Sequence, residues 1–296
     1  KHLLKEKEIL LNVPEGYEIV PSSEGMRRVR FMAQSPDGRL FATDMHDLSD
    51  NSKGKVWVLD DFDSISGRFA TREGYLDGLR NPNNVAFATD RSGVTWLYIG
   101  LTDRLVRYRY SDGDMKPSSA AETLATFPDS GRSYREGGWH LTRTVIAAPN
   151  DKLYVSVGSS CNVCEEKEEV RATILEMNLD GSGSRTYAQG LRNAVGLTWV
   201  GDEKGALFAT NMGADHLGLD KPEDNFYRIE EGADYGWPWA YEYEGTITAD
   251  PVYGTKPQAT ATSDVGLSWV GFPGHASPLG LAFFGPDAAP PLANTF

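Results

Sequence analysis

A four-residue apolar motif occurs four times along the 296-residue chain at nearly constant spacing. The copies begin at residues 40, 97, 153 and 207, so successive starts lie 57, 56 and 54 residues apart; they read LFAT, LYIG, LYVS and LFAT. Self-similarity at a fixed period marks a repeat architecture in which each copy is one supersecondary unit. Each copy follows a short apolar segment and a polar turn, as at residues 35–38. One unit is therefore predicted to run strand, turn, strand.

The second repeat shows what a whole unit contains. Four short segments with strand character follow one another there, at residues 84–87, 95–101, 105–110 and 122–127. Four antiparallel strands make one blade of a β-propeller. Further blades are predicted to open at residues 144–147, 197–200 and 281–284. We predict an all-β, six-bladed propeller of four-stranded blades, with 1–296 as a single propeller domain that is incomplete at its C-terminus; a five-bladed ring is the alternative.

The charge and the cysteines limit the partners and the compartment. A net charge of −13 argues against nucleic acid or an anionic membrane surface as a partner, and no apolar stretch approaches the ~18 residues needed for membrane insertion. The chain begins with Lys1 rather than Met, which indicates processing or trimming. Its only two cysteines are Cys161 and Cys164, too few for a four-ligand zinc site. A small structural disulfide is favoured over free thiols, which predicts a secreted or periplasmic protein.

Propeller topology places distant loops at the same end of the molecule. In an up-and-down blade, the loop that enters the inner strand and the loop between the second and third strands lie at one face. Several basic residues lie just before predicted inner strands and are expected to converge near the axis: Arg28, Arg80, His140, Arg192 and His275.

Two of these residues have side chains that could take part in catalysis. His140 can act as a general base near neutral pH, or it can be a structural histidine bonded to a neighbouring loop. Arg192 can hold a carboxylate or stabilise developing negative charge. The alternative is that Arg192-Asn193 belongs to the repeat itself, because the sequence GLRN occurs at 78–81 and again at 190–193.

One loop is rich in carboxylates and carbonyl groups. It runs from residue 211 to 225 and contains Asp215, Asp220, Glu223 and Asp224. Such a loop suits a hard cation such as Ca²⁺, which takes six to eight oxygen ligands, although its spacing is not that of an EF-hand. A solvated acidic loop is the alternative interpretation.

Several of these segments together resemble the pyrroloquinoline quinone (PQQ)-dependent sugar dehydrogenases. The similarity extends from about Arg28 to the end of the chain, and it is greatest to the sorbosone and pyranose dehydrogenase branch. The segments that carry it are His140, LYVSVGSSCNVCEE at 153–166, GLRNAVGL at 190–197, YGWP at 235–238 and GHASPLG at 274–280.

The resemblance implies oxidation of a sugar (an aldose, a pyranose or a sugar aldehyde such as sorbosone) with PQQ and Ca²⁺ as cofactors. His140 matches the general base that removes the hydroxyl proton while hydride passes to the quinone, and Arg192 matches the arginine that contacts quinone and substrate. Electrons would then pass to an acceptor that is a quinone, a dye or a cytochrome. The further residues expected at the cofactor are Asn193, Arg28, Asn83 and His275; those expected at the metal are Gly213, Ala214, Asp215 and Asp224.

The chain departs from this family at three places. A glutamine expected near the entry to the second blade has no clear match, and Asn83 is the nearest candidate. The basic residues expected to bind the cofactor carboxylates would lie beyond Phe296. Where the glucose-oxidising branch pairs its histidine with a carboxylate, this sequence has Ser159, so Glu165 or Glu166 would have to take that role. Two other functions stay open: a calcium-dependent lactonase-type hydrolase and a non-catalytic carbohydrate-binding propeller. The hydrolase would need acidic metal ligands at the axis, whereas the axial positions here are basic or histidine.

Overall fold

The structure is a computed structural model that describes residues 2–4, 7–129 and 139–296. Its regular structure is almost entirely β-strand, and a single 3-10 turn at Thr262–Asp264 is the one helical element among these residues. The all-β prediction is confirmed. No helix in the described part of the chain is long and apolar enough to cross a bilayer.

Sixteen of the strands form four antiparallel four-stranded blades within the described residues. Blade 1 consists of β3 (Val29–Gln34), β4 (Leu40–Asp44), β5 (Gly54–Asp63) and β6 (Arg68–Leu79). Blade 2 consists of β7 (Val85–Thr89), β8 (Thr95–Gly100), β9 (Arg104–Tyr110) and β10 (Glu122–Thr126). Blade 3 consists of β11 (Arg143–Ala148), β12 (Lys152–Val157), β13 (Thr173–Asn178) and β14 (Arg185–Gln189). Blade 4 consists of β15 (Ala194–Val200), β16 (Ala206–Asn211), β17 (Asp224–Ile229) and β20 (Val270–Phe272).

Two hairpins lie outside the blades. The first is β1 (His2–Leu4) with β2 (Lys7–Ile9), and the second is β18 (Ala240–Tyr243) with β19 (Thr246–Ala249). The second hairpin belongs to an insertion, residues 230–269, between the third and fourth strands of blade 4.

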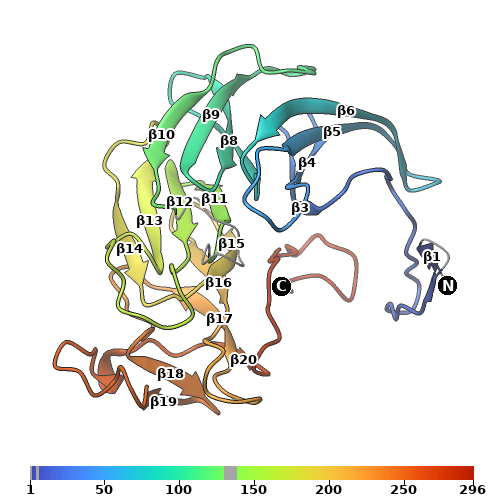
Figure 1. The fold of residues 1–296 in the computed structure, drawn as a ribbon. Coiled ribbons are helices and arrows are strands. Elements are labelled where there is room, and N and C mark those ends of the chain that lie inside the picture. Colours follow the sequence, from blue (N-terminus) through green and yellow to red (C-terminus); the bar gives the residue numbers. More distant parts are fainter. Residues whose placement is uncertain (1, 5–6, 130–138) are drawn as a thin grey trace.

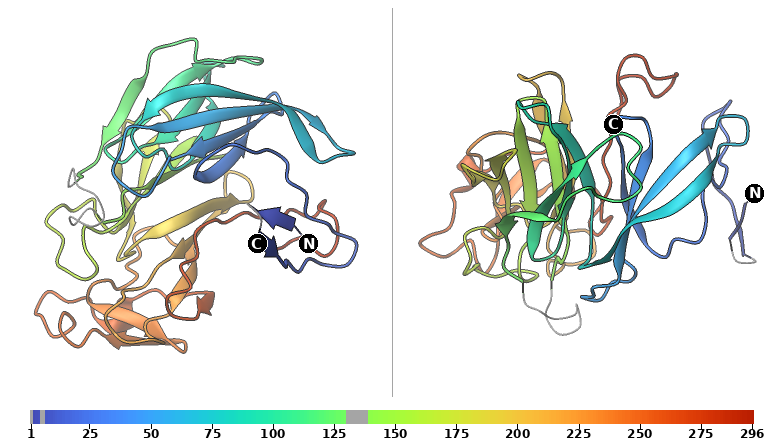
Figure 2. Two further views of the ribbon diagram at one scale, coloured as in Figure 1. Left: turned by 45° about the vertical axis from the view of Figure 1, so that its right-hand side comes forward. Right: turned by 90° about the horizontal axis from the view of Figure 1, so that it is seen from above.

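The four blades follow one another in an arc (Figure 1). Neighbouring inner strands contact in the order β3, β7, β11, β15. Each pair of adjacent blades encloses its own apolar core, represented by Phe41 and Leu97 between blades 1 and 2, Tyr98 and Val155 between blades 2 and 3, and Ile174 and Ala209 between blades 3 and 4. The arc stays open between blades 4 and 1, and the C-terminal segment lies in this opening in both views of Figure 2.

The repeated tetrads lie in the second strand of each blade, namely β4, β8, β12 and β16. The fourth residue of each tetrad lies against the inner strands. Thr43 donates its hydroxyl hydrogen to Asn83 O at 2.5 Å, and Thr210 accepts a hydrogen bond from the amide of Gly196 at 3.0 Å. The equivalent Gly100 has no room for a side chain, because a Cβ there would lie 2.2 Å from the carbonyl oxygen of Arg143.

The blade count and the last predicted strand differ from the expectation. The described residues form four blades rather than six, and the strand predicted at 281–284 is wrong, because only an isolated bridge joins Phe284 to Thr295 there. A strand needs a partner whose amides and carbonyls match its own over several residues. Residues 285–296 instead turn back through short hydrogen-bonded turns. This segment is tied to the N-terminal region by the hydroxyl of Tyr17, which donates to Pro290 O at 2.8 Å.

Candidate active site

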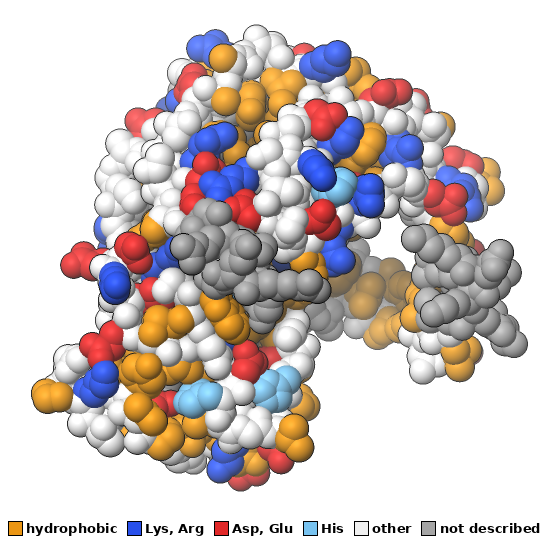
Figure 3. Space-filling view, in the orientation of Figure 1, with side chains coloured by type: hydrophobic (Ala, Val, Ile, Leu, Met, Phe, Trp, Pro, Cys, Tyr) orange, Lys and Arg blue, Asp and Glu red, His pale blue; other side chains and the backbone are white. Residues whose placement is uncertain are grey.

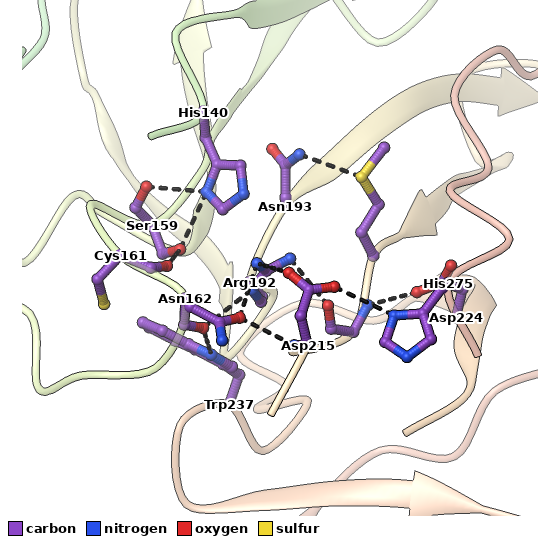
Figure 4. Close-up of polar contacts among 12 residues, drawn as sticks. His140, Ser159, Cys161, Asn162, Arg192, Asn193, Asp215, Asp224, Trp237 and His275 are labelled. Atoms are coloured by element: carbon purple, nitrogen blue, oxygen red, sulfur yellow. Dashed lines mark hydrogen bonds and ion pairs between the residues drawn. The ribbon is translucent and has the colours of Figure 1, made fainter. Parts of the chain in front are cut away.

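His140 lies at the entrance to β11 with its backbone in the left-handed region (φ 48°). Its Nδ1 lies 2.9 Å from the main-chain oxygen of Ser159 and 3.0 Å from the hydroxyl of the same residue. That hydroxyl donates its own hydrogen to Cys161 O at 2.6 Å, so both Ser159 oxygens can only accept from the ring. Nδ1 therefore carries the proton, and Nε2 is left with a free lone pair (Figure 4).

The surroundings of His140 keep its ring neutral. Burial, followed by the positive charge of Arg192 and then of Arg143 and Arg171, lowers the pKa of His140 to about 3. Arg143 also holds the histidine backbone in place, because its Nη1 donates to His140 O at 2.6 Å. Both Arg143 and Arg171 are buried, and both donate to the carbonyl oxygen of Pro128. At neutral pH the imidazole is therefore uncharged: Nδ1 carries its one ring proton, and Nε2 can accept another.

The guanidinium of Arg192 is held from several sides. Its Nε and Nη2 donate to the main-chain and side-chain oxygens of Asn162, both at 2.9 Å. Its Nη1 donates to Gly213 O at 2.8 Å, and Nη2 forms an ion pair with Asp215 at 3.0 Å. The Cζ atom lies 5.9 Å from the centre of the Trp139 ring, within reach of a cation–π contact. The Arg192 side chain is 4% exposed, so its position is tightly defined.

The same sequence motif has another outcome in blade 1. Arg80, which occupies the equivalent position in GLRN, forms ion pairs with Asp50 and Asp129. Asn81 closes the preceding loop, because its side chain binds Asn51 N and Ser49 O. The repeat interpretation therefore describes the first copy well. In the second copy the arginine binds mainly carbonyl oxygens beside His140.

The loop after β16 brings the predicted metal residues together. Asp224 is 2% exposed and accepts hydrogen bonds from the amides of Gly213 and Ser277, at 2.7 and 2.6 Å. Asp215 lies between Arg192 and His275, whose Nδ1 is 3.2 Å from the carboxylate. His275 also bonds Gly218 O at 2.8 Å, and these contacts raise its pKa. Ala214 packs against Trp237.

The donor chemistry of this loop is compatible with Ca²⁺. Main-chain carbonyls at 213 and 214 and the carboxylate of Asp215 offer hard oxygen ligands, which Ca²⁺ prefers. Gly213 O has a second lone pair besides the one that Arg192 uses. The one cluster of three acidic, histidine or cysteine ligands among the described residues is Cys161, Cys164 and Glu166, and its two sulfurs are bonded to each other. The predicted disulfide is confirmed. A metal ion in the loop after β16 would therefore bind mainly to carbonyl oxygens.

The other predicted cofactor residues are placed less uniformly. Asn193 is near His140, since both side chains lie within 2.6 Å of where a Cβ of Gly158 would stand. Asn83 is fully buried and its amide is already occupied, with Arg30 donating to Oδ1 and Nδ2 donating to Thr144. Arg28 lies exposed at the start of blade 1. Among the described residues, no hydrogen bond or ion pair joins Asn83 or Arg28 to the His140–Arg192 network, so their role in binding stays a prediction.

Neither of the two glutamates expected to pair with His140 in place of the family's carboxylate bonds to it. Glu165 forms an ion pair with Lys256 and accepts a hydrogen bond from Gln258, while Glu166 accepts from Ser160. The backbone oxygen of Ser159 takes this place. Sequence reasoning also missed Asn162, because an asparagine inside a short cysteine loop carries no signal of the partners that it will meet in three dimensions.

Comparisons with known proteins identify the family and the fold. The family model described as glucose/sorbosone dehydrogenase matches residues 98–296. A comparison with curated protein sequences gave no significant match.

Solved structures share the fold at low sequence identity. The PQQ domain of pyranose dehydrogenase from Coprinopsis cinerea, in its holo form, aligns with a TM-score of 0.74 and 19% identity, over 93% of this chain and 73% of its own. A calcium structure of a family AA12 carbohydrate-active enzyme from Trichoderma reesei gives 0.70 and 17%, over 88% and 71%. The PQQ-bound aldose sugar dehydrogenase from Streptomyces coelicolor gives 0.62 and 20%, over 90% and 75%. The chain belongs to the glucose/sorbosone dehydrogenase family and is an oxidoreductase that acts on sugars.

Proposed function

We propose that this protein oxidises a sugar (an aldose, a pyranose or a sugar aldehyde such as sorbosone) with PQQ and Ca²⁺, and that His140 is the general base. The observation that carries this proposal is the state of His140, whose Nε2 is left unprotonated by the Ser159 carbonyl bond to Nδ1. The pyranose dehydrogenase and aldose sugar dehydrogenase neighbours, whose structures contain PQQ, support the choice of cofactor. The calcium structure of the AA12 neighbour supports the choice of ion.

The chain's residues divide the work between holding groups and moving a proton. Arg192 and Asn193, with Arg28, Asn83 and His275, are the proposed cofactor-binding residues, and Arg192 also serves catalysis. The carbonyls of Gly213 and Ala214 are the proposed calcium ligands, supported by Asp215 and Asp224. When bound, PQQ with its calcium ion supplies the acceptor for the substrate's hydride.

The proton chemistry follows from two side chains. Nε2 of His140 accepts the proton of the sugar hydroxyl that is oxidised. The guanidinium of Arg192 stabilises the negative charge that develops on that oxygen as the proton leaves. Because hydrogen bonds hold both groups before substrate arrives, little reorganisation is needed at the moment of reaction.

Three broader proposals accompany this function. The propeller to which residues 1–296 contribute is a single domain with six blades in its closed ring. The open arc, with exposed Met32 on blade 1 and exposed Val270 on blade 4, supports this. The electrons pass to a quinone, a dye or a cytochrome. The protein works in a secreted or periplasmic location, which its disulfide supports.

Dye-linked oxidation of a panel of aldoses, pyranoses and sugar aldehydes tests the proposal. Activity should require both PQQ and Ca²⁺ and should fall by about 100-fold or more in His140→Ala. His46→Ala is the matched control, because His46 pairs with Asp47 in blade 1 and should leave the rate unchanged. A folded protein that oxidises no sugar after loading with both cofactors would overturn the proposal.

A further inference from the structure

A short disulfide-closed loop lies between the two proposed catalytic groups. It connects β12 to β13, and the bond between Cys161 and Cys164 encloses only two residues, Asn162 and Val163. On one side, Cys161 O accepts a hydrogen bond from the hydroxyl of Ser159, the residue whose oxygens hold the His140 ring. On the other side, Asn162 contacts Arg192 (Figure 4).

Asn162 makes four hydrogen bonds with two oxygen atoms. Its main-chain oxygen accepts from Nε of Arg192 at 2.9 Å and from Nε1 of Trp237 at 3.2 Å. Its side-chain Oδ1 accepts from Nη2 of Arg192 and from the amide of Asp215, both at 2.9 Å. One residue of blade 3 thus fixes the guanidinium that blade 4 supplies, together with the start of the proposed calcium loop.

The insertion at residues 230–269 supports this loop from outside. The hydroxyl of Tyr253 donates to Val163 O at 3.1 Å, and Lys256 pairs with Glu165. The two cysteines and Val163 pack against a small apolar cluster of Ala172, Ala214 and Trp237. Figure 3 shows charged side chains of both signs interspersed over one face of the molecule. The loop itself is anchored by the specific contacts of Tyr253, Lys256 and the apolar cluster.

We propose that Asn162 is a positioning residue that fixes the Arg192 guanidinium relative to the His140 imidazole across the boundary between blades 3 and 4. The functional part of this inference rests on the proposed function. An arginine side chain is long and flexible, so its head needs fixed acceptors if it is to meet a developing charge at a defined place. A displacement of about 1 Å in such a group can lower the rate by about 100-fold.

Three variants of the full chain separate positioning from folding. Asn162→Ala removes Oδ1, whereas Asn162→Asp keeps an oxygen at that place for Arg192 and Asp215. Asn178→Ala is the matched control, because Asn178 ends β13 in the same blade, where its side chain bonds Ser182 and Lys152. With PQQ and Ca²⁺ added, Asn162→Ala should lower kcat for sugar oxidation by 10- to 100-fold, about the effect of a lost outer-shell contact. Asn162→Asp should recover most of the loss, and Asn178→Ala should match the wild type.

A second measurement on the protein without cofactor makes the outcome independent of the proposed function. The two groups that donate to Oδ1 of Asn162 are the Nη2–H group of Arg192 and the amide of Asp215. Both should exchange slowly with solvent in the wild type and in Asn162→Asp, and at least ten times faster in Asn162→Ala. Wild-type kcat in Asn162→Ala, or equal exchange in all three proteins, would overturn the proposal. If the wild type oxidises no sugar, the proposed function is lost, and the exchange rates alone then decide whether Asn162 positions Arg192.

Discussion

The Nδ1 atom of His140 and the main-chain oxygen of Ser159 lie 2.9 Å apart at the end of blade 3 where the chain enters β11. A carbonyl oxygen orients the ring and selects its tautomer as a carboxylate would, but it brings no negative charge. The three arginines around the ring therefore act without a compensating carboxylate from this partner, and together with burial they lower the pKa of His140. Several consequences can be measured.

The first consequence concerns the pH dependence of activity. With a pKa of about 3, His140 stays neutral, with Nε2 unprotonated, well below the usual histidine range. The rate of sugar oxidation should therefore show no loss between pH 7 and pH 5 that follows an ordinary histidine titration near 6.5. A pH profile of kcat/KM measures this. An acid limb with an apparent pKa of 6 to 7 would contradict the prediction if it disappears when His140 is replaced by a side chain that does not titrate.

The low pKa of His140 should also make the stability of the fold depend on pH, in the opposite direction from a histidine held in an ion pair. In the folded protein His140 binds its proton near pH 3, whereas in the unfolded chain it does so near pH 6.5. Between these values the unfolded state holds more protons, so the contribution of His140 lowers the free energy of unfolding as the pH falls from about 6.5 toward 3. Urea denaturation of the wild type and of His140→Asn across this range isolates the effect, because the wild type should lose stability more steeply. Parallel curves for the two proteins would contradict the assignment.

Replacing Arg192 by lysine tests whether the planar guanidinium matters more than its charge. Lysine keeps the charge but cannot contact Asn162, Gly213 and Asp215 together. We expect kcat/KM to fall by about 100-fold, the size of effect seen when one donor to a developing oxyanion is removed. Arg80→Lys in the equivalent motif should leave kcat/KM nearly unchanged, because Arg80 binds Asp50 and Asp129 rather than the oxygens that hold Arg192. Equal activities of the two variants would show that Arg192 has no special role.

Removing the disulfide should affect activity more than stability. Closing a loop of four residues stabilises a fold by only about 2 kcal/mol in the chain-entropy model. The double variant Cys161→Ser with Cys164→Ser should therefore melt only a few degrees lower. Its kcat should fall by at least tenfold, because Cys161 O and Asn162 lie within the released loop. Unchanged kcat in this variant would mean that the surrounding contacts hold the loop without the bond.

A stability variant inside blade 3 tests the fold apart from the site. Tyr154 is 1% exposed, and its hydroxyl donates to Glu176 and accepts from Asn150, both at 2.9 Å. Tyr154→Phe leaves the buried carboxylate short of a donor and should lower the free energy of unfolding by about 1–3 kcal/mol with unchanged kcat. Tyr187→Phe is the control, because its ring packs against Tyr154 but its hydroxyl has no hydrogen-bond partner within the described residues. Equal unfolding free energies for the two variants would contradict the role of the Tyr154 hydroxyl.

The sequence predicts the blade architecture well because the repeat is local. Each tetrad is a second strand whose apolar residues face a neighbouring blade, so the period alone indicates where strands lie. The strand at 281–284 could not be settled in this way, since an apolar segment becomes a strand only if a partner pairs with it. Loop contacts are less predictable still. His140 and Arg192 were identifiable by type and position, whereas the backbone of Ser159 and the amide of Asn162 have roles that depend on folded geometry.

The most direct measurement of the central claim follows the bound cofactor itself. Protein loaded with PQQ and Ca²⁺, mixed rapidly with an oxidisable sugar in the absence of any dye, should show the absorbance change of cofactor reduction within a single turnover. His140→Ala, loaded to the same level, should show that change at least about 100 times more slowly, since the proton then has no base at Nε2. Equal rates in the two proteins, or no absorbance change in the wild type with any sugar of the panel, would contradict the account.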